Sequence, residues 1–278
     1  MKGLNELIMT IMVSVVLGET ISGNSTSNLI GVSSQTVSDK ELAKKFAPQL
    51  RFDRKAATFP QSPVWFWENS YTNENGNRIQ NPPVAKTWPK DPTTMATMYH
   101  VETCDTGRVL IEFWFFYSYQ NECSPGIGSH HGDWERVVVA INDAQTTVDR
   151  ITYHQHSGRY TRNAGSFTTQ DGTHPVVYVG KKSHGSYHDD GGSGTCLYYE
   201  DYRNQGTIMK RYSVWNEGTM LPTYGEEDWQ NFLGKWGKDG IKGPAARDRD
   251  VCTRTRCEEE GCWVGKNQGS GSLGATAT

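Results

Sequence analysis

The chain has 278 residues, of which 35% are hydrophobic and 21% are charged, and it contains 29 glycines and 11 prolines. This mixture is typical of a loop-rich globular fold and disfavours a long helical bundle. The formal charge of −3 gives no bulk attraction to nucleic acid or to an anionic membrane.

The first residues predict secretion. Lys2 precedes a short apolar run over 7–18, which is too short to span a bilayer and has the length of a signal-peptide core. Val16 and Gly18 are small enough for the −3 and −1 positions of a cleavage site after residue 18. The sequence therefore predicts a signal peptide over 1–18.

Polar sequence follows this apolar run. Residues 19–38 are rich in Ser, Thr and Asn and predict a flexible leader. Such a leader offers a helix at 7–18 nothing to pack against, which disfavours the alternative of a buried N-terminal helix. Asn24 begins the only N-x-S/T sequon and predicts a glycosylation site. We expect the mature protein to be secreted and extracellular.

A short helix and a strand are the first elements predicted after the leader. Ser38 is a good N-cap for a helix that ends before Pro48, and Glu41 completes a capping box. Alternating residues over 49–53 predict a strand. The stretch over 68–92 is rich in Asn, Pro and Thr and predicts long surface loops.

The centre of the chain predicts a sandwich of strands. Two β-prone runs, 108–117 and 136–141, are apolar on both faces, as central strands covered by other elements should be. Further candidates are 150–156 and 174–180 and, more weakly, 198–202 and 207–215. Many short strands separated by turn residues are typical of an antiparallel sandwich. We therefore expect a mainly β fold, an antiparallel β-sandwich with a few short helices and long loops.

The end of the chain predicts a helix and a tail. A helix is expected near 226–233, where Gly234 is a stop signal. The sandwich domain is expected to cover 39–249. Residues 250–278 form a cysteine-containing tail whose small polar end predicts disorder.

Six cysteines follow the predicted signal peptide, and an even number in a secreted chain favours disulfides. Cys104 and Cys123 flank the long aromatic strand, so a bridge between them requires the flanking loops to fold back. We expect this bridge. The remaining four are expected to pair among themselves and to attach the tail to the sandwich; they are Cys196, Cys252, Cys257 and Cys262.

One run of residues, from His130 to Glu135, carries most of the chemistry. Residues two apart share a face of an extended strand, so Asp133 and Glu135 are predicted to form a carboxylate pair, with Trp134 turned into the core on the other side. Two carboxylates beside His130 predict a site for a hard divalent cation, Ca²⁺ or Mg²⁺, or an acid–base pair. A charged sheet edge, with Glu135 paired to Arg136, explains the same residue types equally well.

Two more histidines fall at predicted strand ends. His156 and His184 each precede a glycine or a serine-glycine pair. Because strand ends on one rim of a sandwich gather, both are expected near His130. A single histidine is usually an ordinary hydrogen-bonded residue, whereas three at successive strand ends predict a shared site.

Several short motifs, in order over roughly 40–245, resemble the vacuolar protein sorting-associated protein 62 family. Each motif is short, but the ordered set is specific. The family's name implies vacuolar sorting, whereas the predicted signal peptide and cysteines indicate an extracellular protein. The motifs are Phe46–Phe52 (FAPQLRF), Phe59-Pro60, Trp114–Tyr117 (WFFY), His130–Glu135 (HHGDWE), Gln155–Gly158 (QHSG), Pro175–Val179 (PVVYV), Ser183–Tyr187 (SHGSY) and Gly234–Gly237 (GKWG).

A more distant resemblance is to the necrosis- and ethylene-inducing peptide 1-like proteins, a family of secreted cytolysins. Their heptapeptide G-H-R-H-D-W-E is similar to 129–135 (SHHGDWE). The resemblance implies a β-sandwich with a divalent cation at its rim that acts on sphingolipid headgroups of plant membranes, and it places His130, Asp133 and Glu135 at the metal positions.

Two departures from that family weaken or change the implied metal site. Gly132 stands where the family has the histidine directly before the aspartate. Tyr119 or the neutral pair Gln120-Asn121 stands where the family has an acidic residue after the aromatic strand.

Residues and resemblances together predict a secreted protein with a cation-dependent rim site that binds a glycan or a glycolipid headgroup. A cytolysin, toxin-like or defence protein is one form of such a protein, and a glycolipid would place it at a membrane surface. His156, His184 and Tyr187 are the predicted ligand-binding residues.

Two other classes of function stay open. A metal-dependent hydrolase would use Asp133 or Glu135 as base and His156 or His184 as acid. The sequence has no G-x-S-x-G elbow, P-loop or H-E-x-x-H motif and no nucleophile with a recognisable activating partner, which disfavours an enzyme. A disulfide-stabilised extracellular structural module is the third class.

Overall fold

The computed structural model describes residues 37–53, 55–80, 95–123, 125–155, 158–192, 201, 203, 208–217, 219–247, 249–254 and 263–264. The predicted signal peptide, the polar leader and Asn24 lie outside these residues. The described part belongs to one contact unit, which begins at Val37.

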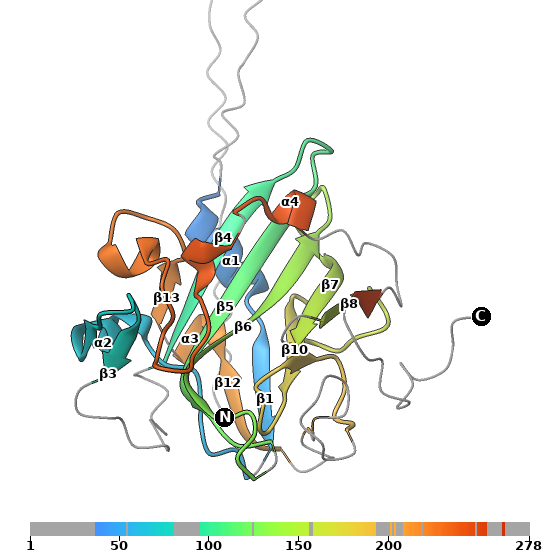
Figure 1. Ribbon diagram of the computed structural model, residues 1–278. Helices are drawn as coiled ribbons and strands as arrows, with labels where there is room; N and C mark the ends of the chain where they lie inside the picture. Colours follow the sequence, from blue (N-terminus) through green and yellow to red (C-terminus); the bar gives the residue numbers. More distant parts are fainter. Residues whose placement is uncertain are drawn as a thin grey trace, which may run out of the picture. The chain divides into compact units, whose positions relative to one another are not determined.

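A seven-stranded sheet carries the longest strands, and Figure 1 shows β4 to β8 side by side. The strand order is β13-β4-β5-β6-β7-β8-β14. The two runs predicted as central strands are β5 and β6, in the interior of this sheet, which confirms that prediction. The bounds are β4 (Ala96–Thr103), β5 (Val109–Gln120), β6 (His130–Ile141), β7 (Val148–Gln155), β8 (Gly158–Asn163), β13 (Thr219–Pro222) and β14 (Trp263–Val264).

A second sheet contains five strands in the order β11-β10-β1-β12, with β9 paired to β10. A separate hairpin is formed by β2 and β3. The bounds are β1 (Gln49–Asp53), β2 (Ser70–Thr72), β3 (Arg78–Gln80), β9 (Thr169–Gln170), β10 (His174–Val179), β11 (Ser186–Tyr187) and β12 (Ile208–Ser213).

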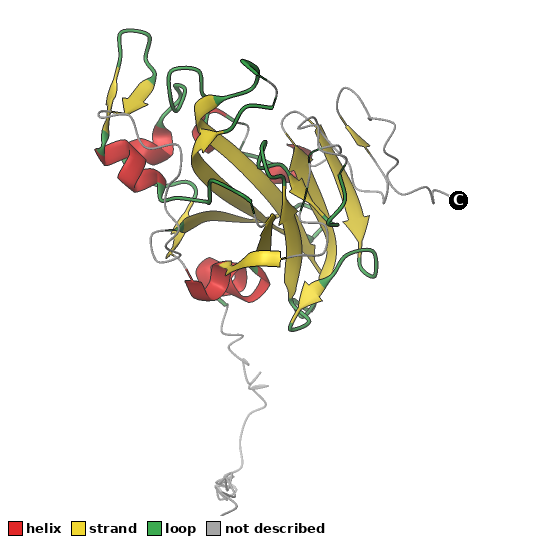
Figure 2. Ribbon diagram, turned by 90° about the horizontal axis from the view of Figure 1, so that it is seen from below, coloured by secondary structure: helices red, strands yellow, loops and turns green. Residues whose placement is uncertain are grey.

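Helices are short, and in Figure 2 the larger ones lie at the margin of the strands. The predicted N-cap is confirmed, because the Ser38 hydroxyl accepts a hydrogen bond from the Glu41 N–H at 3.3 Å. The helical elements are α1 (Asp39–Phe46), α2 (Pro63–Glu68), α3 (Val214–Glu217), α4 (Val251–Arg254) and the 3₁₀ turns η3 (Asp228–Asn231) and η4 (Pro244–Ala246).

The fold is mainly β with two principal sheets, as predicted, but two strand pairs are parallel. β1 pairs with β10 and β13 pairs with β4 in the parallel sense. A parallel pair needs a long crossover, and in both cases most of the antiparallel sheet lies between the two partners in sequence. Local strand patterns carry no signal for such a return, so the sequence predicted only antiparallel pairing.

The main core contains residues of both sheets. Odd-numbered residues of β5 and β6, such as Phe113 and Val139, share one buried cluster with Leu50 of β1 and Val177 of β10. Even-numbered aromatic residues of β5 and β6 face the other way and form a second cluster with Trp236. Burial of each large apolar side chain contributes about 1.5–3 kcal/mol, so both faces of the long strands stabilise the fold.

Two expected elements differ from the structure, and a third is not tested by it. The helix expected near 226–233 is the single 3₁₀ turn η3, and the stretch over 68–92 contains the β2–β3 hairpin. The hairpin was missed because its strands have three residues each, too few for a visible alternation. The strand candidate over 198–202 lies largely outside the described residues.

The expected disulfide pairing is wrong. Cys104 is bonded to Cys252, with a Cα–Cα distance of 5.7 Å, and not to Cys123. Since β5 is a fully extended strand of twelve residues, its two ends lie too far apart for the expected bridge. The remaining four therefore do not pair only among themselves. Cys123 is also disulfide-bonded, and Cys196, Cys257 and Cys262 lie outside the described residues.

None of the helices in the described part of the chain has the length and hydropathy of a membrane span.

Candidate functional site

Asp133 and Glu135 lie on the same face of β6. They pair across the ladder with Tyr117 and Phe115 of β5, whose side chains belong to the core between the sheets. The carboxylate pair is therefore turned inward, with 1% of Asp133 and 3% of Glu135 exposed. Trp134, between them, points to the other face and packs in the second aromatic cluster. The strand alternation expected from the sequence is present.

His184 approaches Asp133 from the second sheet. It lies in the turn between β10 and β11, and its Nδ1 is 2.8 Å from Asp133 Oδ2. The imidazole ring stacks on Tyr117, with ring centroids 3.9 Å apart. The backbone of His184 is left-handed, with φ of 59°. A non-glycine residue held in that region is often a functional position, and the turn aims this ring at the carboxylate.

The second nitrogen of His184 contacts a hydroxyl. Thr58 Oγ1 lies 2.6 Å from His184 Nε2. When Nδ1–H donates to Asp133, Nε2 accepts from the Thr58 hydroxyl, so the three groups form a hydroxyl–imidazole–carboxylate series. Such a series can activate a hydroxyl as a nucleophile. Here only 2% of Thr58 and of His184 is exposed, so a substrate does not reach the hydroxyl in this conformation.

A third buried carboxylate lies beside this series. Asp201 is fully buried, and its Oδ2 accepts hydrogen bonds from the Ser183 hydroxyl at 2.6 Å and the Ser183 N–H at 2.9 Å. Its Oδ1 has no hydrogen-bond partner in the described part of the chain. Burial raises the pKa of Asp201 above 3.8, opposed by the Ser183 hydrogen bonds and the charge of His184.

Two buried tyrosines border the carboxylates. Burial, with the charges of Glu135 and Asp133, raises the pKa of Tyr117 well above 10.0. Burial and the charge of Asp201 do the same for Tyr187. Both phenols stay neutral and can act as hydrogen-bond donors at physiological pH. Tyr187, a predicted ligand-binding residue, is fully buried, with the guanidinium of Arg203 4.0 Å from its ring centroid.

The packing around Gly132 explains why glycine stands where the cytolysin heptapeptide has a histidine. Its φ is 72°, and a Cβ at this position would overlap the carbonyl of Trp236. The 236–240 loop packs directly on the backbone of Gly132, because the Ile241 N–H donates to the Gly132 carbonyl at 3.3 Å. A histidine side chain does not fit there, so this chain lacks that possible ligand for a structural reason.

The predicted metal residues are not assembled into a coordination shell. Oxygen donors suit Ca²⁺ or Mg²⁺ by type, and atoms that share one such ion lie within about 5 Å of each other. His130, Asp133 and Glu135 do not bring one ligand atom each to within 4.8 Å of the other two. His130 is half-buried at the start of β6. The donors thus fit a hard cation by chemistry but not by spacing, and the cation stays a prediction.

A second cluster of metal-ligating residue types lies between β4 and the tail. Glu102, Asp250 and Cys252 bring their ligand atoms together. Cys252 is in the disulfide with Cys104, and Glu102 accepts the Val251 N–H at 2.6 Å. This group therefore anchors the tail to β4.

Of the two histidines predicted at strand ends, the structure describes only His184. His184 joins Asp133 as expected from the gathering of strand ends, and His156 lies outside the described residues. No sequence motif contains Thr58 or Asp201, so neither could be identified as a site residue from the sequence. The visible signals of the site were the two carboxylates that precede the valines of β6 and the histidines at predicted strand ends.

Residues 121–239 match the protein-family model described as vacuolar protein sorting-associated protein 62. The matched segment contains the His130–Glu135 run and His184 and covers less than half of the chain. Comparison with curated proteins finds no match.

Solved structures that resemble this chain include necrosis- and ethylene-inducing protein 2 from the causal agent of witches' broom disease of cocoa. The identity is 24%, the match covers 56% of this chain and 70% of that chain, and the TM-score is 0.40. A second is NLPPya in complex with mannosamine, with 17% identity, coverage of 70% and 87%, and a TM-score of 0.39. A third is the non-toxic HaNLP3 protein, with 15% identity, coverage of 69% and 78%, and a TM-score of 0.39. Both resemblances seen in the sequence are thus found by these comparisons.

Proposed function

We propose that this chain is a secreted protein that binds a glycan or a glycolipid headgroup, with the site built around Asp133, Glu135 and His184. One observation carries the proposal: Asp133 and Glu135 lie almost fully buried on one face of β6, and the His184 imidazole reaches Asp133 from the other sheet at 2.8 Å. Burying a carboxylate is costly unless it is paired. Residues that depart from the apolar pattern of their own strand are expected at functional sites.

Hydroxyl-rich ligands suit this set of groups. Carboxylate oxygens accept hydrogen bonds from sugar hydroxyls, and the neutral phenols of Tyr117 and Tyr187 can donate them. Binding requires opening of the network, since these side chains are buried. A toxin-like or defence protein at a glycolipid surface is the form of this function that the sequence resemblance implies.

The predicted Ca²⁺ or Mg²⁺ dependence is part of the proposal. His130, Asp133 and Glu135 would hold the ion, and their side chains would have to move closer to one another to do so.

A glycan and lipid array, probed with the full secreted chain in Ca²⁺ and again in chelator, tests the proposal. Binding that chelator removes and added Ca²⁺ restores is the expected result. Binding that chelator does not change would support the glycan site and contradict its dependence on a cation. Absence of binding to every printed glycan and lipid would reject the function.

A hydrolase is the second candidate, and the Thr58–His184–Asp133 series is the observation that favours it. The near-complete burial of Thr58 disfavours it. Release of a cleaved product from an array-bound glycan, lost in Thr58→Val, would establish the enzyme. Binding without product release supports the glycan-binding protein.

A further inference from the structure

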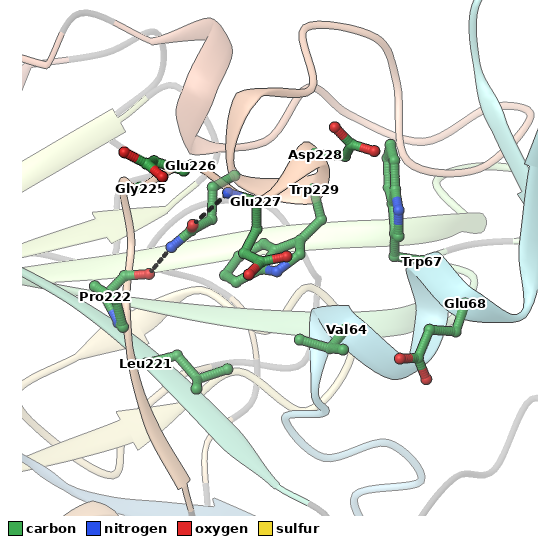
Figure 3. Close-up of a pocket in the computed structure, with 11 residues that line it drawn as sticks. Val64, Trp67, Glu68, Leu221, Pro222, Gly225, Glu226, Glu227, Asp228 and Trp229 are labelled. Carbon is green, nitrogen blue, oxygen red and sulfur yellow. Dashed lines mark hydrogen bonds between the residues drawn. The ribbon is translucent and has the colours of Figure 1, made fainter.

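A cavity of about 610 Å³ lies between α2 and the segment that follows β13 (Figure 3). Its volume is within the range of about 300–1,000 Å³ that small-molecule sites have. The aromatic cluster that includes Trp134 and Trp229 belongs to the outer face of β5 and β6, whereas Asp133 and Glu135 face the core between the sheets. The cavity is therefore separate from the site proposed above.

Two tryptophans form walls of this cavity. Trp67 comes from α2 and Trp229 from η3, and Figure 3 shows Trp229 near the centre and Trp67 to its right, with Val64 and Leu221 below. Trp229 is 8% exposed and packed in the aromatic cluster, so its position is fixed. The guanidinium of Arg78 already lies 3.8 Å from the Trp67 ring centroid, so this indole takes part in a cation–π contact within the protein.

Four carboxylates complete the lining, and no Lys, Arg or His side chain is among the residues that line the cavity. Within the described part of the chain, none of the four has a salt-bridge partner. Arg78, behind Trp67, donates instead to the backbone carbonyls of Trp67 and Ser70. The lining is therefore strongly anionic. The carboxylates are those of Glu68, Glu226, Glu227 and Asp228.

The wall that carries three of these carboxylates is held in place. The buried side chain of Gln230 donates to the Pro222 carbonyl at 2.7 Å and accepts the Glu227 N–H at 3.2 Å, as the dashed lines in Figure 3 show. Gln230 thus ties η3 to the end of β13. A preorganised wall reduces the entropy lost when a ligand binds.

We propose that this cavity binds a small organic ammonium ion, a cationic nitrogen carried on an apolar body. Indole rings attract such a cation through their electron-rich faces, and the carboxylates supply the opposite charge. A bare Ca²⁺ or Mg²⁺ suits the cavity less, because those ions need oxygen ligands on all sides and two walls are indole and aliphatic. A neutral ligand brings no charge opposite to that of the four carboxylates.

Choline tests this proposal against the neutral alcohol in which carbon replaces its ammonium nitrogen. Both have the same shape, so the difference in their dissociation constants isolates the charge. Titration calorimetry of the full chain should show choline binding at least about tenfold tighter at low salt. The indole N–H signals of Trp67 and Trp229, assigned by Trp67→Phe and Trp229→Phe, should be those that shift.

The decisive variant is the triple change Glu68→Gln, Glu226→Gln and Asp228→Asn, all at exposed positions. It should lose choline binding by about tenfold or more, while Asp149→Asn, at an exposed position on β7, should keep it. Equal binding of choline and the alcohol would overturn the proposal, as would absence of binding by both. Binding retained in the triple variant, or shifts confined to other tryptophans, would also overturn it.

Discussion

His184 Nδ1 lies 2.8 Å from Asp133 Oδ2, and this contact joins the two sheets of the fold. Asp133 is on β6 of the seven-stranded sheet, whereas His184 is in the turn that connects two strands of the five-stranded sheet. Because both side chains are almost fully buried, the pair has a structural role as well as the binding role proposed for it. Substitutions that separate the two roles are therefore the most informative.

Asp133→Asn and Asp133→Ala should differ in stability. The amide oxygen of Asn can still accept from His184 Nδ1–H, so we expect Asp133→Asn to change the unfolding free energy by less than about 1 kcal/mol. Asp133→Ala removes that acceptor and leaves His184 buried without it, at a cost of about 1–3 kcal/mol. Chemical denaturation in chelator measures both. Equal losses would show that the negative charge of Asp133, and not its hydrogen bond, stabilises the fold.

Gly132→Ala should be strongly destabilising. A Cβ at Gly132 would overlap the Trp236 carbonyl, whereas at Gly107, with a φ of 81°, it would meet nothing within 4 Å. Gly107→Ala is therefore a control for the cost of a side chain at positive φ alone, about 1 kcal/mol of unfolding free energy. We expect Gly132→Ala to exceed this cost by at least about 1–3 kcal/mol, the usual cost of overpacking. Similar thermal shifts for the two variants would contradict the close packing of the 236–240 loop on β6.

Loss of the Cys104–Cys252 disulfide should reduce stability more than most point substitutions. The bridge closes a sequence separation of 148 residues, and the chain-entropy model assigns about 5 kcal/mol to a loop of this length. The double variant Cys104→Ser/Cys252→Ser should therefore unfold at much lower denaturant concentration. Peptide mapping of the unreduced protein is the direct check, and a peptide linking Cys104 to Cys123 would refute the observed pairing.

His174 should make stability fall in mild acid. Its Nδ1–H donates to the Ala47 carbonyl at 2.8 Å, and its ring stacks on Trp215. Burial lowers the pKa of His174 below 6.5, with the Ala47 hydrogen bond opposing this. The unfolded chain therefore binds the proton more readily, so this contribution is present above 6.5 and is lost as the pH falls through the folded pKa.

The matched variant for this effect is His174→Phe, which keeps an aromatic ring against Trp215 and does not titrate. The difference in unfolding free energy between wild type and variant should decrease from about pH 7.5 to pH 5. A difference that is constant over this range, measured by urea denaturation, would show that burial of His174 does not disfavour its charged form.

Much of the fold could be predicted because its strongest signals are local. The bounds of α1 follow from the Ser38 cap, and β5 and β6 follow from long runs of β-branched and aromatic residues. The parallel pairing of β1 with β10 could not be predicted, because it depends on the return of a chain segment more than a hundred residues later. The cysteine pairing failed for the same reason.

The site residues also divide into those that local sequence patterns predicted and those that depend on tertiary packing. Strand alternation was sufficient to place Asp133 and Glu135 on one face, and the gathering of strand ends was sufficient to bring His184 near them. Their burial was not predictable, because an acidic pair at a strand end is usually solvated. Thr58 and Asp201 belong to no sequence motif, and tertiary packing brings them to the site.

The most direct test of the central claim is an array comparison of wild type with Glu135→Gln, with Glu112→Gln as the matched control. Glu112 is also a buried carboxylate, but it lies on β5 and is paired with Arg136 at 2.9 Å. We predict that Glu135→Gln loses the glycan or lipid signals that wild type gives, while Glu112→Gln retains them in proportion to its folded fraction. Retention of every signal by a folded Glu135→Gln would contradict the account.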